Sequence, residues 1–403
     1  MQDTPKPLKK GYKFPIYPNA AQRTQLEKTF GCCRYVYNRA LAESRETYAA
    51  YNELLSKGVI NPKDRPQVDG YYFVDRITDY KRDEESLWLK EVSSIALQQS
   101  MLHLGAAYTR FFRERKGFPR FKKKQSAQSF SLTRNGFTLV GNQLMLAKTD
   151  GLIKVAFSRE LPSEPSSLTI SRTSTCKYYV SFTCEYTPKK TKGQGVIGLD
   201  AGISALITTS AGEKIENLKV TKTYAAKLRR AQQALARKQK GSKNRTKARL
   251  HVARVHERIA NIRRNRLHQL SRRLVNENQV IGMESLKVAN MVKNHHLAKA
   301  IQDASWRSLR TMLEYKVVES QHATLVLMDT YYPSSHLCNE TGRKLDRKLK
   351  LSERKWPCPH CDKWHDRDVN AALNIEKAAW NTARKYDPGE RAGKILLANA
   401  YKA

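Results

Sequence analysis

Two stretches of the chain share one pattern, Val196-Ile-Gly-Leu-Asp200 and Val280-Ile-Gly-Met-Glu284. Each places two β-branched residues before a glycine, which is typical of a buried strand that a neighbouring backbone approaches closely. Each stretch then ends on a carboxylate. The pattern predicts two central strands whose last residues are acidic.

A third acidic residue, Asp368, stands at a predicted helix start, in His365-Asp-Arg-Asp368-Val-Asn-Ala-Ala. Apolar residues follow it at helical spacing. Asp200, Glu284 and Asp368 lie 84 residues apart in both intervals, so only folding can bring them together. Carboxylates are the ligands that Mg²⁺ prefers, and two such ions about 4 Å apart support phosphodiester hydrolysis. A single acid at a strand end is more often a solvated cap, but its repetition in the same setting favours a nuclease.

The three stretches resemble the motifs of RuvC-like nucleases, which belong to the RNase H fold group. Their flanks resemble the TnpB family, RNA-guided nucleases of bacterial insertion sequences that are related to the type V CRISPR effectors. The supporting matches keep the family's order: Tyr17-Pro-Asn-Ala-Ala-Gln22, Tyr35-Val-Tyr-Asn-Arg39, Gly117-Phe-Pro-Arg-Phe-Lys122, Asp303-Ala-Ser-Trp306, Leu313-Glu-Tyr-Lys316 and Tyr332-Pro-Ser-Ser335. They extend over nearly the whole chain.

The resemblance implies an α+β multidomain fold. We expect a wedge-like β-barrel with a helical insert, followed by an RNase H-like (RuvC) α/β nuclease domain that carries a zinc-ribbon-like insertion. The residues agree, because Asn135-Gly136, Gly141-Asn142 and Asp150-Gly151 are hairpin signals. The expected segments are 1–18 and 117–190 for the barrel, 19–116 for the helical recognition insert, 191–330 and 364–403 for the nuclease domain, and 331–363 for the insertion.

The chain carries 74 Lys and Arg against 37 Asp and Glu, a formal charge of +37 with a pI near 10.0. Such an excess predicts a polyanionic partner. Membrane insertion is not expected, because no apolar run approaches the ~20 residues of a spanning helix. The start of the chain lacks the apolar core of a signal peptide, and seven cysteines, an odd number, argue against a disulfide framework. We therefore expect a cytoplasmic protein.

Basic residues are concentrated in two segments. Residues 222–273 contain 18 Lys and Arg against one acid, too lopsided for internal ion pairing, although such runs are usually solvated faces. The loop 117–124 mixes aromatic and basic residues, which is typical of base stacking and phosphate contact but also of a solvated loop. The candidate nucleic-acid contacts are Arg120, Lys122, Lys123, Arg229, Arg230, Arg263 and Arg264.

Three cysteines near the C-terminus indicate a zinc site. Cys358-Pro-His-Cys361 is a C-x-x-C knuckle, half of a tetrahedral site. The upstream half has only Cys338, because Thr341 stands where the family pattern has the second cysteine. Either a histidine completes a structural Zn²⁺ site, or the ribbon has lost its metal. We favour retained zinc, with a fourth ligand chosen from His336, His360 and His365.

The leading hypothesis is an RNA-guided DNA endonuclease of a mobile element, in which Asp200, Glu284 and Asp368 hold two Mg²⁺ ions. Asp366 lies beside the third acid, but the resemblance favours Asp368, directly before Val-Asn-Ala-Ala. The expected partners are a guide RNA and double-stranded target DNA bearing a short adjacent motif, with one protein copy on one RNA in the bacterial cytoplasm, at the nucleoid when DNA is bound. The alternatives are an RNA-guided repressor that has lost cleavage and, less favoured, a DNA transposase.

Overall fold

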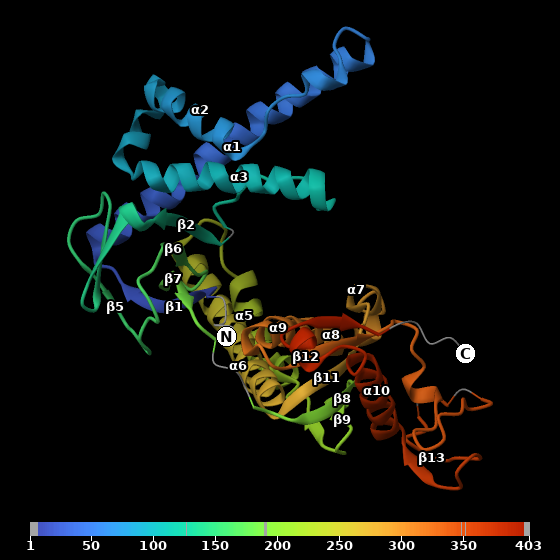
Figure 1. Ribbon diagram of the computed structural model, residues 1–403. Coiled ribbons are helices and arrows are strands. Elements are labelled where there is room, and N and C mark those ends of the chain that lie inside the picture. The colour runs from blue at the N-terminus through green and yellow to red at the C-terminus, as the bar shows by residue number, and fades with distance from the viewer. Residues whose placement is uncertain (1–6, 126, 189–191, 348, 351, 399–403) are drawn as a thin grey trace. The chain divides into compact units, whose positions relative to one another are not determined.

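The computed structural model describes residues 7–125, 127–188, 192–347, 349–350 and 352–398. The chain divides into two compact units, with the boundary between Tyr186 and Thr187. Six stretches lie outside the described residues: 1–6, 126, 189–191, 348, 351 and 399–403 (Figure 1). They include the outermost parts of the expected barrel and nuclease segments.

The first unit contains an antiparallel sheet of seven strands in the order β2-β6-β7-β1-β5-β4-β3. The chain passes from one edge strand to the other between Thr133 and Phe137, a step of at most ~14 Å. A flat sheet of this size would separate its edges by nearly 30 Å, so the sheet must curl into a half-barrel. Its strands are β1 (Leu8–Tyr17), β2 (Gln128–Thr133), β3 (Phe137–Val140), β4 (Gln143–Leu146), β5 (Ile153–Val155), β6 (Ser167–Arg172) and β7 (Tyr178–Tyr186).

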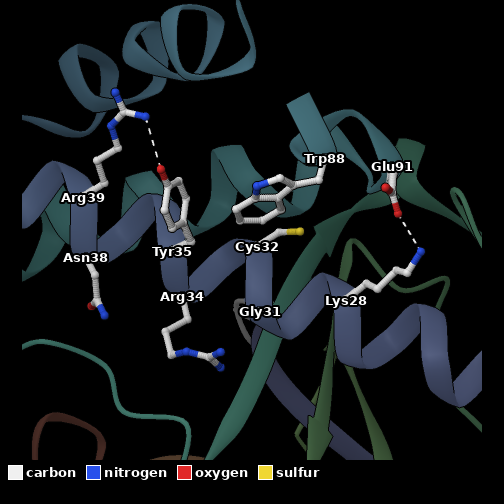
Figure 2. A pocket seen from close by; sticks show the side chains of 9 residues that line it. All are labelled: Lys28, Gly31, Cys32, Arg34, Tyr35, Asn38, Arg39, Trp88 and Glu91. Carbon is white, nitrogen blue, oxygen red and sulfur yellow. Dashed lines mark hydrogen bonds and ion pairs between the residues drawn. The ribbon is translucent and has the colours of Figure 1, made fainter. Parts of the chain in front are cut away.

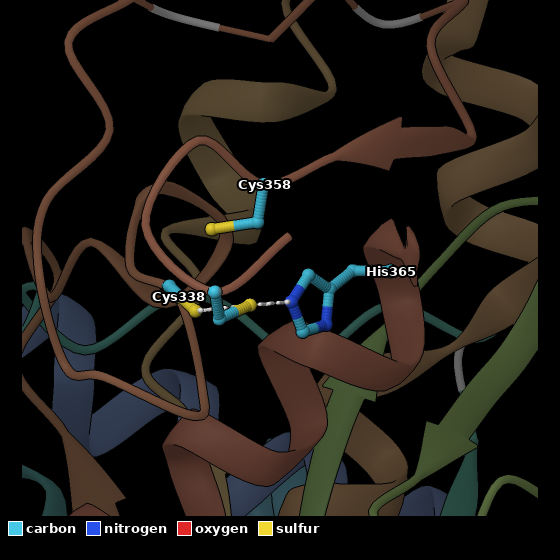
Figure 3. Close-up of side chains that lie close together, drawn as sticks. Cys338, Cys358 and His365 are labelled. Carbon is cyan, nitrogen blue, oxygen red and sulfur yellow. Dashed lines mark hydrogen bonds between the residues drawn. The ribbon is translucent and has the colours of Figure 1, made fainter. Parts of the chain in front are cut away.

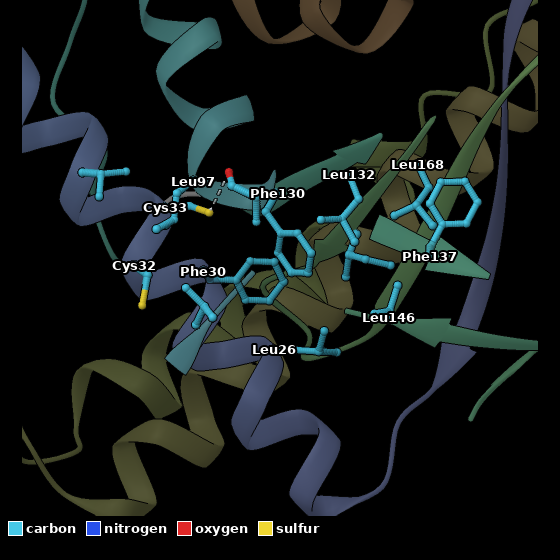
Figure 4. Close-up of a cluster of buried hydrophobic side chains, with 14 of the residues drawn as sticks. Leu26, Phe30, Cys32, Cys33, Leu97, Phe130, Leu132, Phe137, Leu146 and Leu168 are labelled. Carbon is cyan, nitrogen blue, oxygen red and sulfur yellow. Dashed lines mark hydrogen bonds between the residues drawn. The ribbon is translucent and has the colours of Figure 1, made fainter. Parts of the chain in front are cut away.

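Helices are inserted between β1 and β2 of this sheet. Asn19 and Gln22 form a capping box, with backbone-to-side-chain hydrogen bonds of 2.9 and 3.0 Å, and this starts a long helix. Aromatic and aliphatic side chains, among them Leu26, Phe30, Phe130 and Leu168, join helices and sheet in one core (Figure 4). The helices are α1 (Ala20–Ser56), α2 (Gly70–Arg82) and α3 (Ser94–Glu114), with the 3₁₀ helices η1 (Pro62–Asp64), η2 (Glu84–Glu91) and η3 (Arg134–Gly136).

The second unit contains a mixed sheet of six strands in the order β10-β9-β8-β11-β12-β15. The first three strands form an antiparallel meander, and β8, β11, β12 and β15 run parallel. Such a mixed sheet agrees with the RNase H-like domain expected from the resemblance. The strands are β8 (Gly195–Ala201), β9 (Ala205–Thr209), β10 (Lys214–Glu216), β11 (Asn278–Glu284), β12 (Thr324–Met328) and β15 (Ile395–Leu397).

Helices cover both faces of this sheet. On one face, α6 (Lys243–Glu277) and α9 (Trp306–Ser320) pack against Leu199, Ile281 and Met283. On the other face, α10 (Arg367–Ala383) packs against Val280, Val326 and Met328. Alternate residues of β8 and β11 therefore face opposite helical layers, which confirms the expected α/β character of this part of the fold.

Short elements complete the second unit: α4 (Val220–Thr223), α5 (Ala225–Ala236), α7 (Val288–Met291), α8 (His295–Ala304), η4 (Ser334–His336), β13 (Lys355–Pro357), β14 (Trp364–Asp366) and α11 (Pro388–Arg391). The basic segment forms α5 and α6, and the chain turns between them at Gly241. None of the helices in the described part of the chain is long and apolar enough to cross a bilayer.

Candidate active site and metal centre

Two glycines decide how closely α10 approaches the sheet. Gly198 of β8 pairs with Gly282 of β11 in the parallel register. A Cβ atom on Gly282 would lie 2.7 Å from Cβ of Ala379, and one on Gly198 would clash with the carbonyl oxygen of Ala372. The repeated Val-Ile-Gly pattern thus provides the groove that seats α10.

Because side chains alternate between the two faces along β8 and β11, Asp200 and Glu284 lie on the face of the sheet that α10 covers. Val280 and Gly282 contact α10, so Glu284 has the same orientation, and Asp200 follows Gly198 in the same way. Asp368 lies in the first turn of α10. Glu284 and Asp368 lie close enough to Asp200 for their charges to raise its pKa. The structure therefore brings together the three residues predicted from the sequence.

Neighbouring side chains fix two of these carboxylates. Ser334 donates its hydroxyl proton to Oε1 of Glu284 at 2.8 Å. Arg354 Nη1 contacts Oδ1 of Asp368 at 3.3 Å. Sequence reasoning missed both partners; Ser334 lies inside the quoted Tyr332-Pro-Ser-Ser335 motif, which was a signal for it, whereas nothing distinguishes Arg354 among the many basic residues.

Asp366 has a different role from Asp368. Its Oδ1 accepts hydrogen bonds from the backbone N–H groups of Asp368 and Val369, at 3.1 and 3.2 Å, so Asp366 is the N-cap of α10. Its Oδ2 lies 2.7 Å from Nζ of Lys214. The helix-start residue is thus Asp366, which is a correction to the sequence analysis, and Asp368 lies two positions inside the helix.

The environment of Asp200 and Glu284 opposes the ionisation of these two acids. Removal from water raises the pKa of Asp200 well above its ordinary value of 3.8, and the charges of Glu284 and Asp368 raise it further. Burial also raises the pKa of Glu284. A divalent cation would reverse both effects, and the donor set of hard carboxylate oxygens fits Mg²⁺. Within the described residues these oxygens are not all within 4.8 Å of one another.

Cys338, Cys358, Cys361 and His365 form a second centre, with ligand atoms that all lie within 4.8 Å (Figure 3). Sγ of Cys361 is 3.6 Å from Sγ of Cys338, and Nε2 of His365 is 3.2 and 3.7 Å from these sulfurs. Tetrahedral zinc with ordinary bond lengths requires about 3.8 Å between sulfurs and about 3.5 Å between sulfur and nitrogen. The four residues therefore fit Zn²⁺.

His365 is the histidine that the structure places with the three cysteines. His360 Nε2 instead lies 3.2 Å from the carbonyl oxygen of Lys344, and His336 is not a member of the cluster. Burial opposes ionisation of the Cys338 thiol, but hydrogen bonds from the backbone and hydroxyl of Thr341, from Cys358 and from the backbone of Glu340 together outweigh it and lower its pKa to about 7. Thr341 thus supports a ligand without joining the cluster.

The predicted nucleic-acid residues have different surroundings. Arg263 Nη2 contacts Oδ1 of buried Asp303 at 2.5 Å, which ties α6 to α8. Nζ of Lys122 lies 4.0 Å from the ring centre of Tyr37, and burial lowers its pKa. Both therefore have structural contacts inside the protein. The other five, Arg120, Lys123, Arg229, Arg230 and Arg264, are exposed.

Three family models match parts of the chain. They are described as "Probable transposase" for residues 178–295, "Helix-turn-helix domain" for residues 8–53, and "Cas12f1-like, TNB domain" for residues 306–375. The second range holds β1 and most of α1 in this structure.

Similar proteins extend over most of the chain. A "Putative RNA-guided DNA endonuclease" of Streptomyces pristinaespiralis is 44% identical over 91% of this chain and 89% of its own. InsQ of Escherichia coli K12, with the same description, is 30% identical over 90% of both chains. The Cas12f1 chain of a cryo-EM structure of a Cas12f1–sgRNA–target DNA complex matches with a TM-score of 0.53 and 11% identity, over 92% of this chain and 99% of that one, which shows a shared fold.

Sequence identity at this level and coverage, together with the family models and the arrangement of strands and acids, shows that the chain belongs to the TnpB family.

Proposed function

We propose that the chain is an RNA-guided DNA endonuclease of a mobile element, which cuts target DNA next to a short adjacent motif by metal-dependent phosphodiester hydrolysis. The observation that carries this proposal is the convergence of Asp200, Glu284 and Asp368 at the α10 face of the sheet. The descriptions of the two relatives support the guided reaction.

In this proposal Asp200, Glu284 and Asp368 hold two Mg²⁺ ions. When bound, such ions activate a water molecule and stabilise the leaving oxygen of a phosphodiester. The chain's own residues prepare the site: Ser334 orients Glu284, and Asp366 fixes the helix turn from which Asp368 projects. Arg354 partly balances the charge of Asp368.

In this proposal a structural Zn²⁺ is held by four ligands: Cys338, Cys358, Cys361 and His365. The strand that carries His365 continues directly into the N-cap of α10. Zinc would therefore stabilise the chain segment that delivers Asp368 to the site.

The proposed partners are a guide RNA and double-stranded target DNA, with one protein copy on one RNA. The exposed residues Arg229 and Arg230 on α5 and Arg264 on α6 supply positive charge for phosphate contacts. The barrel segments and the helical insert, with the boundaries expected from the sequence, would read the adjacent motif. Its DNA substrate would place the protein at the bacterial nucleoid.

The test is cleavage by the full chain co-expressed with the DNA that flanks its gene. The substrate is a plasmid library with a guide-matched target beside a randomised motif, supplied with Mg²⁺ or with a chelator. Cuts restricted to matched targets with Mg²⁺ support the proposal. Binding without cutting would identify a guided repressor, and joining of DNA ends would identify a transposase.

A further inference from the structure

A pocket of about 760 Å³ lies in the first unit, between α1 and η2 (Figure 2). It is far from the residues of the proposed nuclease site in sequence and belongs to the other unit. The proposed reaction uses none of its residues, so the pocket calls for a separate explanation.

Aromatic side chains form one wall of this pocket. Trp88 is 39% exposed, and its ring centre is 4.9 Å from that of Tyr35, with the rings at 66°. The indole N–H already donates to the carbonyl oxygen of Glu85 at 3.0 Å, so the indole offers chiefly its ring surface to a ligand. Cys32 lines the same pocket, and burial raises the pKa of its thiol to about 11, which keeps it uncharged. The wall is suited to a flat aromatic group.

Hydrogen bonds hold the basic segment 122–124 at the rim of the same pocket. Asn38 lines the pocket. Its side-chain oxygen accepts a hydrogen bond from the backbone N–H of Lys122 at 2.8 Å, and its side-chain nitrogen donates to the carbonyl oxygen of Lys122 at 2.9 Å. A second lining residue, Arg34, donates to Oε1 of Gln128 at 2.7 Å, and Gln128 Nε2 donates to the carbonyl oxygens of Lys123 and Lys124, both at 3.2 Å.

These contacts hold the backbone of residues 122–124 and leave two ammonium groups in solvent. Lys123 and Lys124 are exposed, and no acidic side chain pairs with them in the described part of the chain. Arg34 also has a neutral partner, Gln128, in place of a carboxylate. Two other basic residues that line the pocket are paired with acids: Lys28 with Glu91 at 2.6 Å, and Arg39 with Glu43 and Asp83 at 3.1 and 2.8 Å. Unpaired positive charge therefore lies at the rim of the pocket, beside Arg34 and Asn38.

We propose that this pocket binds one unpaired nucleotide of a single-stranded nucleic acid, with its base stacked on Trp88 and its flanking phosphates at Lys123 and Lys124. The inference rests on the proposed function only in requiring a nucleic-acid partner. A base inside a duplex is already stacked on its neighbours and cannot enter the pocket, whereas an unpaired base can exchange that surface for the indole. RNA and DNA share this chemistry.

The test measures binding of the full chain, in the presence of a chelator, to fluorescent probes of about a dozen nucleotides. The probes are a single-stranded RNA, the single-stranded DNA of the same sequence, and the corresponding blunt DNA duplex. Trp88→Leu should weaken single-strand binding about tenfold, because stacking on one aromatic residue contributes roughly 1–3 kcal/mol. Trp88→Phe should retain most of the affinity, and duplex binding should stay unchanged.

Trp380→Leu is the matched control, since Trp380 is 36% exposed and belongs to the other unit. Cross-linking of a 5-iodouridine RNA to Trp88 or Tyr35 provides a second readout that needs no variant. An effect on RNA alone, DNA alone or both supports the pocket and identifies the strand. Unchanged single-strand affinity of a folded Trp88→Leu protein, or equal losses for single strand and duplex, would overturn it. A chain that binds in this way but never cuts would refute only the proposed function.

Discussion

Gly198 of β8 lies directly beside Gly282 of β11, and both lie under α10. The pair accounts for the geometry of the candidate active site, because the helix that rests on it carries Asp368, while β11 ends on Glu284 and β8 carries Asp200 one residue before its end. A side chain at either glycine would push the helix, and with it Asp368, away from the sheet.

Gly198→Ala should therefore destabilise the protein by about 3 kcal/mol or more, since the added methyl group meets the α10 backbone and cannot be accommodated by a side-chain movement. Chemical denaturation measures the change. Gly389→Ala is the control, because a Cβ atom there meets nothing within 4 Å and the glycine does not need a positive φ. Equal stabilities for the two variants would contradict the proposed role of the glycine pair.

The raised pKa of Asp200 predicts how stability depends on pH. The folded-state pKa lies above the unfolded value, so the folded chain binds more protons between the two. The free energy of unfolding of the metal-free protein therefore falls as pH rises through this window, and Asp200→Asn removes that contribution. Urea unfolding with a chelator, from about pH 4 to pH 8, should show the variant gaining stability over the wild type as pH rises. A constant or shrinking difference would show that Asp200 is not held in this environment.

His365→Ala should lower zinc content from about one ion per chain and weaken zinc affinity at least tenfold, because it removes one of four ligands. His365→Cys should restore binding, since a thiolate can replace the imidazole. His360→Ala, which alters a histidine outside the cluster, should change neither value. Elemental analysis and competition with a zinc indicator provide the measurements. Normal zinc in His365→Ala would refute the assignment of the fourth ligand.

The exposed pair Arg229 and Arg230 should respond to substitution differently from Arg263. Arg229→Ala with Arg230→Ala should reduce the slope of log affinity for DNA against log salt by about 1.8, as two lost phosphate contacts require. Arg263→Ala should leave that slope unchanged but destabilise the fold by about 3 kcal/mol, because it leaves the buried carboxylate of Asp303 without its cationic partner. A reversed pattern would mean that Arg263, and not the α5 pair, contacts DNA.

Local sequence patterns predicted the parts of this structure that depend on local chemistry. The two Val-Ile-Gly strands are the example, because β11 ends on Glu284 as predicted and β8 extends one residue beyond Asp200. The distinction between His365 and His360 could not be drawn in this way, because both lie near the knuckle in sequence and only the pairing of β13 with β14 brings His365 to the sulfurs.

Other features depend on distant partners. The three-residue strand β15 exists because it pairs with Leu325–Leu327 of β12. The assignment of Asp366 as the helix cap needs the backbone geometry of α10, since either aspartate could cap a helix on sequence alone. The roles of Ser334 and Arg354 likewise follow from contacts across 50 and 14 residues.

Comparison of Asp368→Asn with Asp366→Asn in guided DNA cleavage tests the central claim most directly. The account predicts that Asp368→Asn binds guide and target like the wild type but does not cut in Mg²⁺. It also predicts that Asp366→Asn, which retains a capping side chain, still cuts. Cleavage by Asp368→Asn at the wild-type rate, or its loss only in Asp366→Asn, would contradict the account.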